Sequence, residues 1–263
     1  MHIIVCVKQV IDTSARIHII DGVVDSQGSP RVVNPYDEFG VEEALSIRKN
    51  HPELPITITA LSLGPESFKG ALKTTLAMGV DNAIHLSDSG FEGLDNLVVA
   101  QILALAIKKM GFDLILCGRQ AVDDDMAQVG PSLAVLLNIP FVSVITRLEL
   151  SQDLRVAHVT RQIEGGSEIL ESPLPLLLTC QKGLNVPRLP SLKGIMAAKK
   201  KSIENLSAVD IGFDSNYPEP HPKRVRQVGL ALPPQRKKAN ILMGSVEESV
   251  SRLVQSLRDS KIV

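Results

Sequence analysis

The sequence contains no tryptophan, and aromatic residues make up only 3% of its 263 residues. Proteins that bind single-stranded nucleic acid stack bases on aromatic side chains, so this chain offers few platforms for such binding. Its 28 Lys and Arg residues are balanced by 29 Asp and Glu residues, which gives a formal net charge of −1. No excess of positive charge therefore indicates a nucleic acid or an anionic membrane as partner.

Long hydrophobic runs are also missing, since none approaches the roughly 20 apolar residues that a membrane-spanning helix needs. The chain begins with a β-branched run at residues 3–7, which predicts a strand and not a targeting segment. We therefore expect a bacterial, cytoplasmic protein without membrane insertion.

Cysteines and catalytic motifs are scarce. Cys6, Cys117 and Cys180 each lie in an apolar run, and no Cys-x-x-Cys or Cys/His spacing suggests a metal site. Buried free thiols in a reducing compartment are expected. The Gly-x-Gly-x-x-Gly motif and the Walker lysine are absent, and no histidine stands in a recognisable nucleophile context. No residue is predicted to be a catalytic acid or base.

The first two thirds of the chain alternate β-branched runs with amphipathic stretches. This pattern predicts a Rossmann-like α/β fold, with a mostly parallel sheet and helices on both faces. Asp21-Gly22 between two short β runs predicts a type I′ hairpin before the first helix. Strands are expected at 3–7, 56–63, 83–86, 114–117, 141–150, 156–163 and 176–180, and helices at 35–48, 66–78, 95–110 and about 131–137.

The character of the sequence changes after Gly183. Prolines become frequent, a run of three lysines occupies 199–201, and strong apolar periodicity returns only at 246–257. A segment with so little core of its own cannot offset the entropy of its ordering. We predict an α/β nucleotide-binding domain at 1–182 and, at 183–263, an arm that folds on a partner, with a disordered linker as the alternative.

Ligands of open parallel sheets bind at the carboxyl ends of the strands. Four segments occupy such positions, at residues 6–8, 34–37, 63–65 and 118–129. The last is a long strand-to-helix loop with glycine at its start and Gly130 at the helix entrance. Its backbone N–H groups are suited to a phosphate, assisted by the helix dipole.

Three consecutive acidic residues, Asp123, Asp124 and Asp125, lie in this loop. They could ligate a divalent metal, form a solvated surface, or shape the loop by accepting hydrogen bonds from its own amides. No fourth ligand stands at a supporting spacing, so we favour the capping role and predict no metal.

Six segments, in this order along the chain, resemble the β subunits of electron transfer flavoproteins. None of them would suffice alone, but together they extend over the first two hundred residues. They are Val5–Asp12, Asn34–Ala44, Gly118–Gly130, Val159–Gly166, Asn185–Arg188 and Ile195–Lys201.

The resemblance implies a heterodimer with a larger α subunit that carries most of an FAD site. The complex would pass electrons from dehydrogenases, such as acyl-CoA dehydrogenases, to an acceptor. The flavin performs the redox step, so we expect an electron-carrier subunit and not an enzyme. The resemblance further implies that this chain binds AMP through Cys6, Asn34, Pro35, Tyr36, Asp37, Leu63, Gly118, Arg119, Gln120, Ala121, Val122, Asp123, Asp124, Asp125, Met126, Ala127, Gln128 and Val129.

Residues that face partners in the family can also be matched. Leu192 falls in the recognition loop that contacts the dehydrogenase, and Ile195 and Met196 follow it. Gln162, beside Arg161, stands where many family members carry an acidic residue that meets an arginine of the α subunit. A neutral side chain can offer only a hydrogen bond there.

Asp124 bears on the identity of the nucleotide. Some family members have glycine at this position and bind a second FAD in place of AMP, which permits electron bifurcation. A side chain here restricts the approach of a pyrophosphate to the backbone and favours AMP, whereas residues 127–131 and the long arm look closer to the bifurcating type. An ATP-using enzyme and a nucleotide-sensing homodimer on a similar scaffold remain alternatives.

Overall fold

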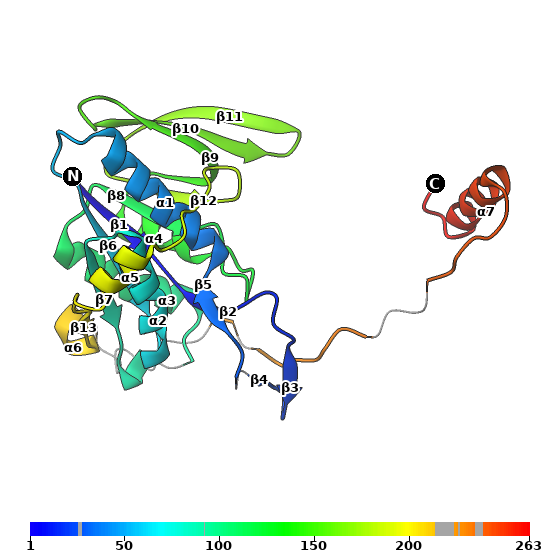
Figure 1. The fold of residues 1–263 in the computed structure, drawn as a ribbon, viewed down its shortest axis with the longest axis horizontal. Coiled ribbons are helices and arrows are strands. Elements are labelled where there is room, and N and C mark those ends of the chain that lie inside the picture. The colour runs from blue at the N-terminus through cyan, green and yellow to red at the C-terminus, as the bar shows by residue number, and fades with distance from the viewer. Residues whose placement is uncertain (26–27, 92, 214–223, 226, 235–238) are drawn as a thin grey trace.

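The computed structural model describes residues 1–25, 28–91, 93–213, 224–225, 227–234 and 239–263. At its centre lies a nine-stranded sheet in the order β11-β10-β9-β12-β8-β1-β6-β7-β13 (Figure 1). Neighbouring strands from β9 to β13 in this order are parallel, and β10 and β11 extend one edge as antiparallel strands. The strands are β1 (His2–Cys6), β6 (Thr57–Leu63), β7 (Asn82–Leu86), β8 (Leu114–Gly118), β9 (Phe141–Leu150), β10 (Val156–Ile163), β11 (Gly166–Pro173), β12 (Leu176–Cys180) and β13 (Glu204–Leu206).

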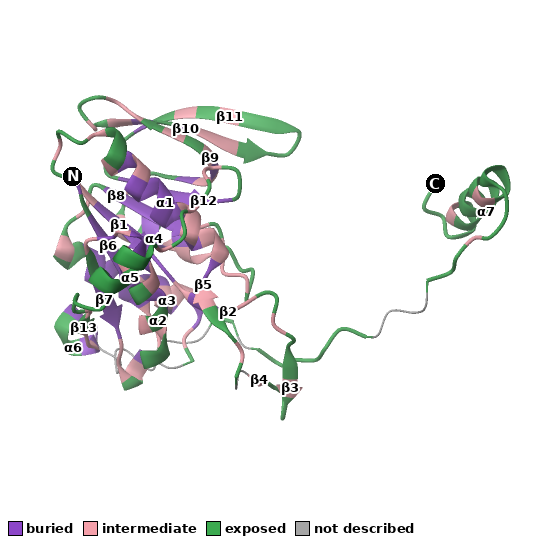
Figure 2. Ribbon diagram, in the orientation of Figure 1, coloured by how far each residue is buried: buried purple, intermediate pink, exposed green. Residues whose placement is uncertain are grey.

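Helices cover both faces of the sheet, as predicted. One group of helices comprises α1 (Pro35–Asn50), α2 (Lys69–Met78) and α5 (Leu192–Ala198), and the core beneath it includes Ile3 and Val5 of β1. The other group comprises α3 (Asn96–Met110), α4 (Val129–Leu137) and α6 (Ala208–Ile211), and the core beneath it includes Ile4 and Cys6 of β1. Successive side chains of a strand point to opposite faces of the sheet, and helices cover both faces. Most side chains of the central strands are therefore apolar, whichever face they point to. Figure 2 shows the buried residues concentrated in this central layer.

Local sequence explains where these helices begin and end. Pro35 occupies the first turn of α1, where its missing N–H removes no helical hydrogen bond. Asp95 caps α3 by accepting hydrogen bonds from the amides of Leu97 and Val98, at 3.1 and 3.0 Å. Gly79 ends α2 with a φ of 124°, a value that favours glycine.

The predicted hairpin is confirmed as β3 (His18–Ile20) and β4 (Val23–Asp25). Asp21 and Gly22 have φ angles of 51° and 77°, as a type I′ turn requires. The hairpin projects from the body of the molecule in Figure 1.

Several elements differ from the prediction. Strand β13 and the pair β2 (Gln9–Ile11) and β5 (Arg31–Val33) were not expected, and neither was β11. Helix α2 begins at Lys69, because the 3₁₀ turn η1 (Glu66–Phe68) precedes it, and a second such turn, η2 (Ser89–Phe91), precedes α3. Helix α4 begins at Val129, so Pro131 lies inside its first turn.

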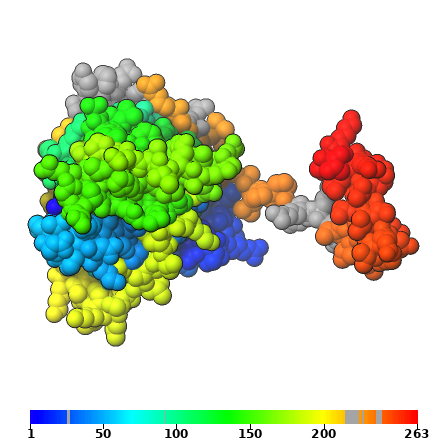
Figure 3. Space-filling model, turned by 90° about the horizontal axis from the view of Figure 1, so that it is seen from above, coloured from blue at the N-terminus to red at the C-terminus, as the bar shows by residue number. Residues whose placement is uncertain are grey.

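The predicted arm begins on the body of the molecule. Arg188 binds Glu42 of α1 and the ammonium of Lys201 donates to the carbonyl of Val80, so this part is anchored to the helices and the sheet. Helix α7 (Val246–Asp259) lies apart from the body in Figures 1 and 3, and none of its residues is buried. Parts of the arm, at 214–223, 226 and 235–238, fall outside the described residues, and the domain boundary stays a prediction.

Within the described parts of the chain, no helix has both the length and the apolar character needed to cross a bilayer.

Candidate functional site

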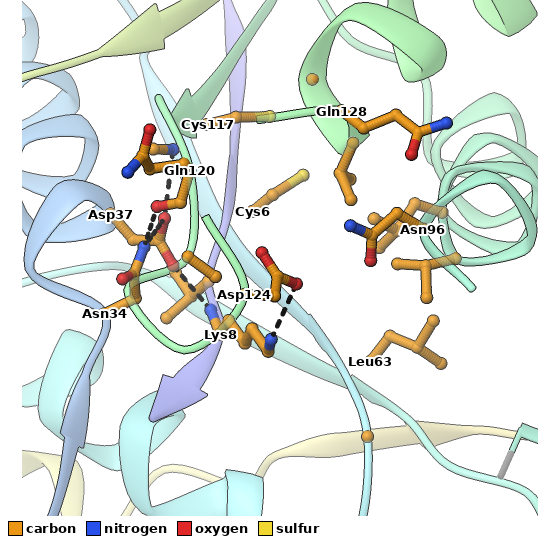
Figure 4. A pocket seen from close by; sticks show the side chains of 18 of the residues that line it. Cys6, Lys8, Asn34, Asp37, Leu63, Asn96, Cys117, Gln120, Asp124 and Gln128 are labelled. Atoms are coloured by element: carbon orange, nitrogen blue, oxygen red, sulfur yellow. Dashed lines mark hydrogen bonds and ion pairs between the residues drawn. The ribbon is translucent and has the colours of Figure 1, made fainter. Parts of the chain in front are cut away.

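A cavity of about 350 Å³ opens at the carboxyl ends of β1, β6 and β8 (Figure 4). Its volume lies in the range of small-molecule sites. Polar groups gather on the side formed by the 118–130 loop and the start of α1. Apolar side chains line much of the remaining wall, namely Leu61, Leu63, Phe68, Phe91, Leu94, Val99 and Leu103.

Asp37, in the first turn of α1, joins three parts of the cavity wall. Its Oδ2 accepts a hydrogen bond from the backbone amide of Lys8 at 2.7 Å. Its Oδ1 accepts from Asn34 Nδ2 at 2.9 Å and from the amide of Gly118 at 3.1 Å. Burial raises the pKa of Asp37 to about 7, against the hydrogen bonds, which lower it.

Asn34 fixes the course of the loop after β8. Its Nδ2 donates to the carbonyl of Gln120 at 2.9 Å, and its Oδ1 accepts from the amide of Val122 at 3.1 Å. Gly118 is required where the loop leaves the strand, because a Cβ there would overlap the Asp37 carboxylate and approach the backbone of Tyr36 to 2.9 Å. The side chains of α1 thus determine the shape of the loop.

The acidic run is held by protein groups. Asp124 Oδ1 accepts from the amide of Met126 at 3.0 Å, which agrees with the capping role expected for the run. Asp125 instead accepts from Gln120 Nε2 at 2.6 Å, and Lys8 Nζ lies 2.7 Å from Asp123 and 3.5 Å from Asp124. Within the described ranges, no group of three His, Cys, Asp or Glu side chains is placed to hold a metal ion.

The end of the loop lines the cavity at the N-terminus of α4. Ala127, with a φ of 52°, is followed by Gln128 in the right-handed helical region, and such a left-handed/right-handed pair can form a concave anion site. In the described structure, the amides of Gln128, Val129 and Gly130 have no protein acceptor. They lie at the positive end of the α4 dipole, so an anion would be favoured there.

The cavity brings together twelve of the eighteen predicted cofactor-binding residues. These are Cys6, Asn34, Asp37, Leu63, Gly118, Arg119, Gln120, Ala121, Asp124, Ala127, Gln128 and Val129. The remaining six do not line it, although they adjoin residues that do. These are Pro35, Tyr36, Val122, Asp123, Asp125 and Met126.

Sequence reasoning missed the wall formed by α3 and the turns before it. Phe91, Leu94, Asn96, Val99 and Leu103 all line the cavity. They follow β7, whose carboxyl end lies at the same edge of the sheet as that of β6. Applying the strand-end rule to β7 would have found the beginning of this wall.

The cysteines are free and buried, as expected. Cys6 and Cys117 line the cavity, whereas Cys180 faces the core beneath α1. A hydrogen bond with Cys6, together with burial, raises the pKa of the Cys117 thiol, and burial raises the pKa of Cys180. Protonated, buried thiols are poor nucleophiles, which agrees with a structural role.

A family model described as "Electron transfer flavoprotein domain" matches residues 21–211, which is most of the chain. The chain is 38% identical over 265 residues to the electron transfer flavoprotein subunit beta of Bacillus subtilis, with both chains covered in full. The chain belongs to the electron transfer flavoprotein β-subunit family.

Relatives of this flavoprotein subunit carry different names. It is 35% identical over 266 residues to the caffeyl-CoA reductase-Etf complex subunit CarD of Acetobacterium woodii, with both chains covered in full. It is 37% identical over 223 residues to protein FixA of Sinorhizobium fredii, which covers 81% of this chain and 76% of the relative. The role of the flavoprotein subunit is therefore in electron transfer, and the resemblance drawn from the motif segments is confirmed.

The predicted partner residues of this flavoprotein subunit lie on two separate surfaces. Leu192, Ile195 and Met196, on α5, are 78%, 40% and 54% exposed. On β10, Arg161 pairs with Glu168 of β11 at 2.7 Å. Gln162 accepts a hydrogen bond from Gln181 Nε2, so its carbonyl oxygen already has a partner within the chain.

Proposed function

We propose that this chain is an electron-carrier subunit that binds AMP in the cavity at the ends of β1, β6 and β8 and works as a heterodimer with an FAD-bearing α subunit. The observation that carries the AMP assignment is the set of unpartnered amides at Gln128, Val129 and Gly130, at the positive end of α4. A phosphate on these amides would place an attached base toward the apolar wall of Phe91, Leu94 and Val99.

Asp124 supports AMP over a second FAD. Its carboxylate lines the cavity and lies 3.5 Å from the ammonium of Lys8. A side chain in this place restricts how closely a pyrophosphate can approach the backbone, whereas glycine would permit a closer approach. The cavity, at about 350 Å³, also lies at the lower end of the range for ligand sites.

The flavin, when bound, supplies the redox chemistry, and the polypeptide supplies binding and orientation. In this proposal Asn34 and Asp37 hold the 118–130 loop in the form that accepts the phosphate. No proton transfer is assigned to this chain.

The deciding experiment is to co-express the chain with the α subunit encoded by the same organism, denature the purified heterodimer and quantify the released nucleotides. One AMP and one FAD per heterodimer is the expected result. Two FAD and no AMP would replace the AMP assignment with the bifurcating type. A chain that forms homodimers, or turns over ATP, and does not associate with a flavin-bearing partner would refute the proposal.

A cavity-filling variant tests the location of the nucleotide. Val99→Trp places an indole in the cavity wall and should abolish AMP retention while leaving FAD bound. Val135→Trp is the matched control, because Val135 is 72% exposed on α4 and does not line the cavity. Equal AMP content in the two variants would mean that AMP binds elsewhere.

We further propose that Leu192 and Met196 anchor the dehydrogenase, and that the end of the arm, with α7, packs on the α subunit. Exposed apolar side chains of this kind are typical of interface hot spots. Leu192→Ala should slow flavin reduction by an acyl-CoA dehydrogenase without loss of FAD or AMP. Val209→Ala, on 86%-exposed Val209 of α6, should leave the rate unchanged. Equal rates for both variants would exclude α5 as the docking surface.

A further inference from the structure

Lys8 makes two kinds of contact in the cavity wall, one through its backbone and one through its side chain. Its backbone amide donates to Asp37 Oδ2, and its ammonium lies 2.7 Å from Asp123 and 3.5 Å from Asp124. Figure 4 shows the contact with Asp124. Asp123 lies 115 positions further along the chain. Lys8 therefore joins the end of β1 to the middle of the loop after β8.

The charges around the cavity make this contact important. The loop that carries the amides of residues 128–130 also carries three carboxylates, and two of them, on Asp123 and Asp124, lie against the ammonium of Lys8. Of the described residues that line the cavity, only Lys8 and Arg119 carry a permanent positive charge. Arg119 Nη1 donates to Gln181 Oε1 at 3.2 Å, so Lys8 is the cation that meets the acidic run.

We propose that Lys8 is a specificity-determining residue of the nucleotide site, because it neutralises Asp123 and Asp124 and so lets a phosphate approach the amides of residues 128–130. Without the ammonium, the two carboxylates would leave uncompensated negative charge in the loop that binds the phosphate, and like charges repel. The inference rests on the proposed AMP site and deepens it, since it names the group that makes an acidic loop select a phosphorylated ligand.

A purely structural role for the ion pair predicts something different. If Lys8 only shaped the loop, its loss would weaken the binding of AMP and of adenosine alike. If Lys8 cancels charge, its loss weakens AMP and spares adenosine, which lacks the phosphate. Removing the two acidic side chains should then restore AMP binding without the lysine.

The test uses heterodimers with the α subunit, stripped of bound nucleotide, and measures the dissociation constants of AMP and of adenosine. Lys8→Met should weaken AMP binding by about 10-fold or more and adenosine binding by less than about 3-fold, since only AMP carries the repelled charge. Lys8→Arg should retain AMP binding. Asp123→Asn and Asp124→Asn, added to Lys8→Met, should recover most of the lost affinity.

Lys69→Met is the matched control. Lys69 also forms a lysine–carboxylate pair, with Glu66 at 2.6 Å, but it does not line the cavity. This variant should bind both ligands like the wild type. Thermal melting of each heterodimer establishes that the variants are folded.

The outcomes separate the two proposals. The role of Lys8 would be overturned, and the AMP site left intact, by any of three results. Lys8→Met could bind AMP like the wild type, it could lose affinity for AMP and adenosine equally, or the asparagine substitutions could fail to restore its AMP binding. A wild-type heterodimer that binds no AMP would overturn both.

Discussion

The most direct physical test of the site concerns the pH dependence of Asp37. Two effects oppose each other at this carboxyl group, which is 6% exposed. Burial raises the pKa to about 7, while the amides of Lys8 and Gly118 and the amide group of Asn34 favour the charged form. A raised pKa means that the folded protein binds the proton more tightly than the unfolded chain does. The unfolding free energy contributed by Asp37 is therefore greatest at low pH and falls as the pH rises toward 7.

The magnitude follows from the two pKa values. A shift from about 4 in the unfolded chain to about 7 in the folded protein lowers the unfolding free energy by about 2–3 kcal/mol between about pH 5 and pH 8. Urea denaturation of the wild type and of Asp37→Asn across this range isolates the effect, because all other titrating groups are common to both proteins. The stability of the wild type relative to the variant should decrease with pH and level off above about pH 7.5.

A relative stability that is flat from pH 5 to 8 would show that the carboxylate is already ionised at pH 5, so that the three donors outweigh burial. A relative stability that rises over this range would be incompatible with a raised pKa. In either case the loop after β8 would be held by a permanently charged Asp37. The pH-independent part of the difference in unfolding free energy is not used in the test, because the asparagine side chain also places an N–H donor against a backbone N–H.

Three other perturbations have definite expected outcomes. Gly118→Ala should lower the unfolding free energy by about 1–3 kcal/mol, because the added methyl overlaps Asp37, whereas Gly166→Ala, with open space around it, should change it by less than about 0.5 kcal/mol in the same urea titration. Arg188→Met should lower the unfolding free energy by about 1–3 kcal/mol, because it leaves the largely buried Glu42 carboxylate without its guanidinium partner. Adding Glu42→Met should recover part of this loss, and no recovery would mean that Arg188 stabilises the protein through packing. Truncation before residue 245 should leave the melting temperature of the isolated chain unchanged, since α7 buries no residue, but should weaken association with the α subunit in sedimentation experiments.

The central sheet could be predicted because its strands are buried on both faces. Residues 114–117 form a continuous apolar run, residues 56–63 are apolar except for Thr57, Thr59 and Ser62, and the structure places both strands next to β1 in the parallel sheet, one on each side. Strand β11 could not be recognised in this way. It pairs on one side only, its Ile169 is 79% exposed and the side chain of Glu171 is 69% exposed, so burial imposes little pattern on its sequence.

The candidate site was predictable where it depends on position in the sheet. Segment 118–130 follows from the rule that ligands bind at the carboxyl ends of parallel strands, whereas segment 34–37 follows the antiparallel strand β5 and begins the first helix. The contact of Lys8 with Asp123 depends on the tertiary fold, because two side chains separated by 115 positions leave no local pattern. Val99 and Leu103 were missed for another reason, since an apolar residue on a helix has the same appearance whether it faces the core or a cavity.

The acidic run shows why side chains alone give a misleading picture of this site. Three consecutive carboxylates suggest a cation, yet each carboxylate accepts a hydrogen bond within the chain, from Lys8, from the Met126 amide and from Gln120. Among the described residues, the backbone amides at the start of α4 have no protein acceptor and remain available to a ligand. The glycines of the loop indicate that its backbone amides suit an anion, but the residue types do not show which amides lack an acceptor. An anion site of this kind is therefore recognised from the geometry of a loop that its acidic residues help to shape.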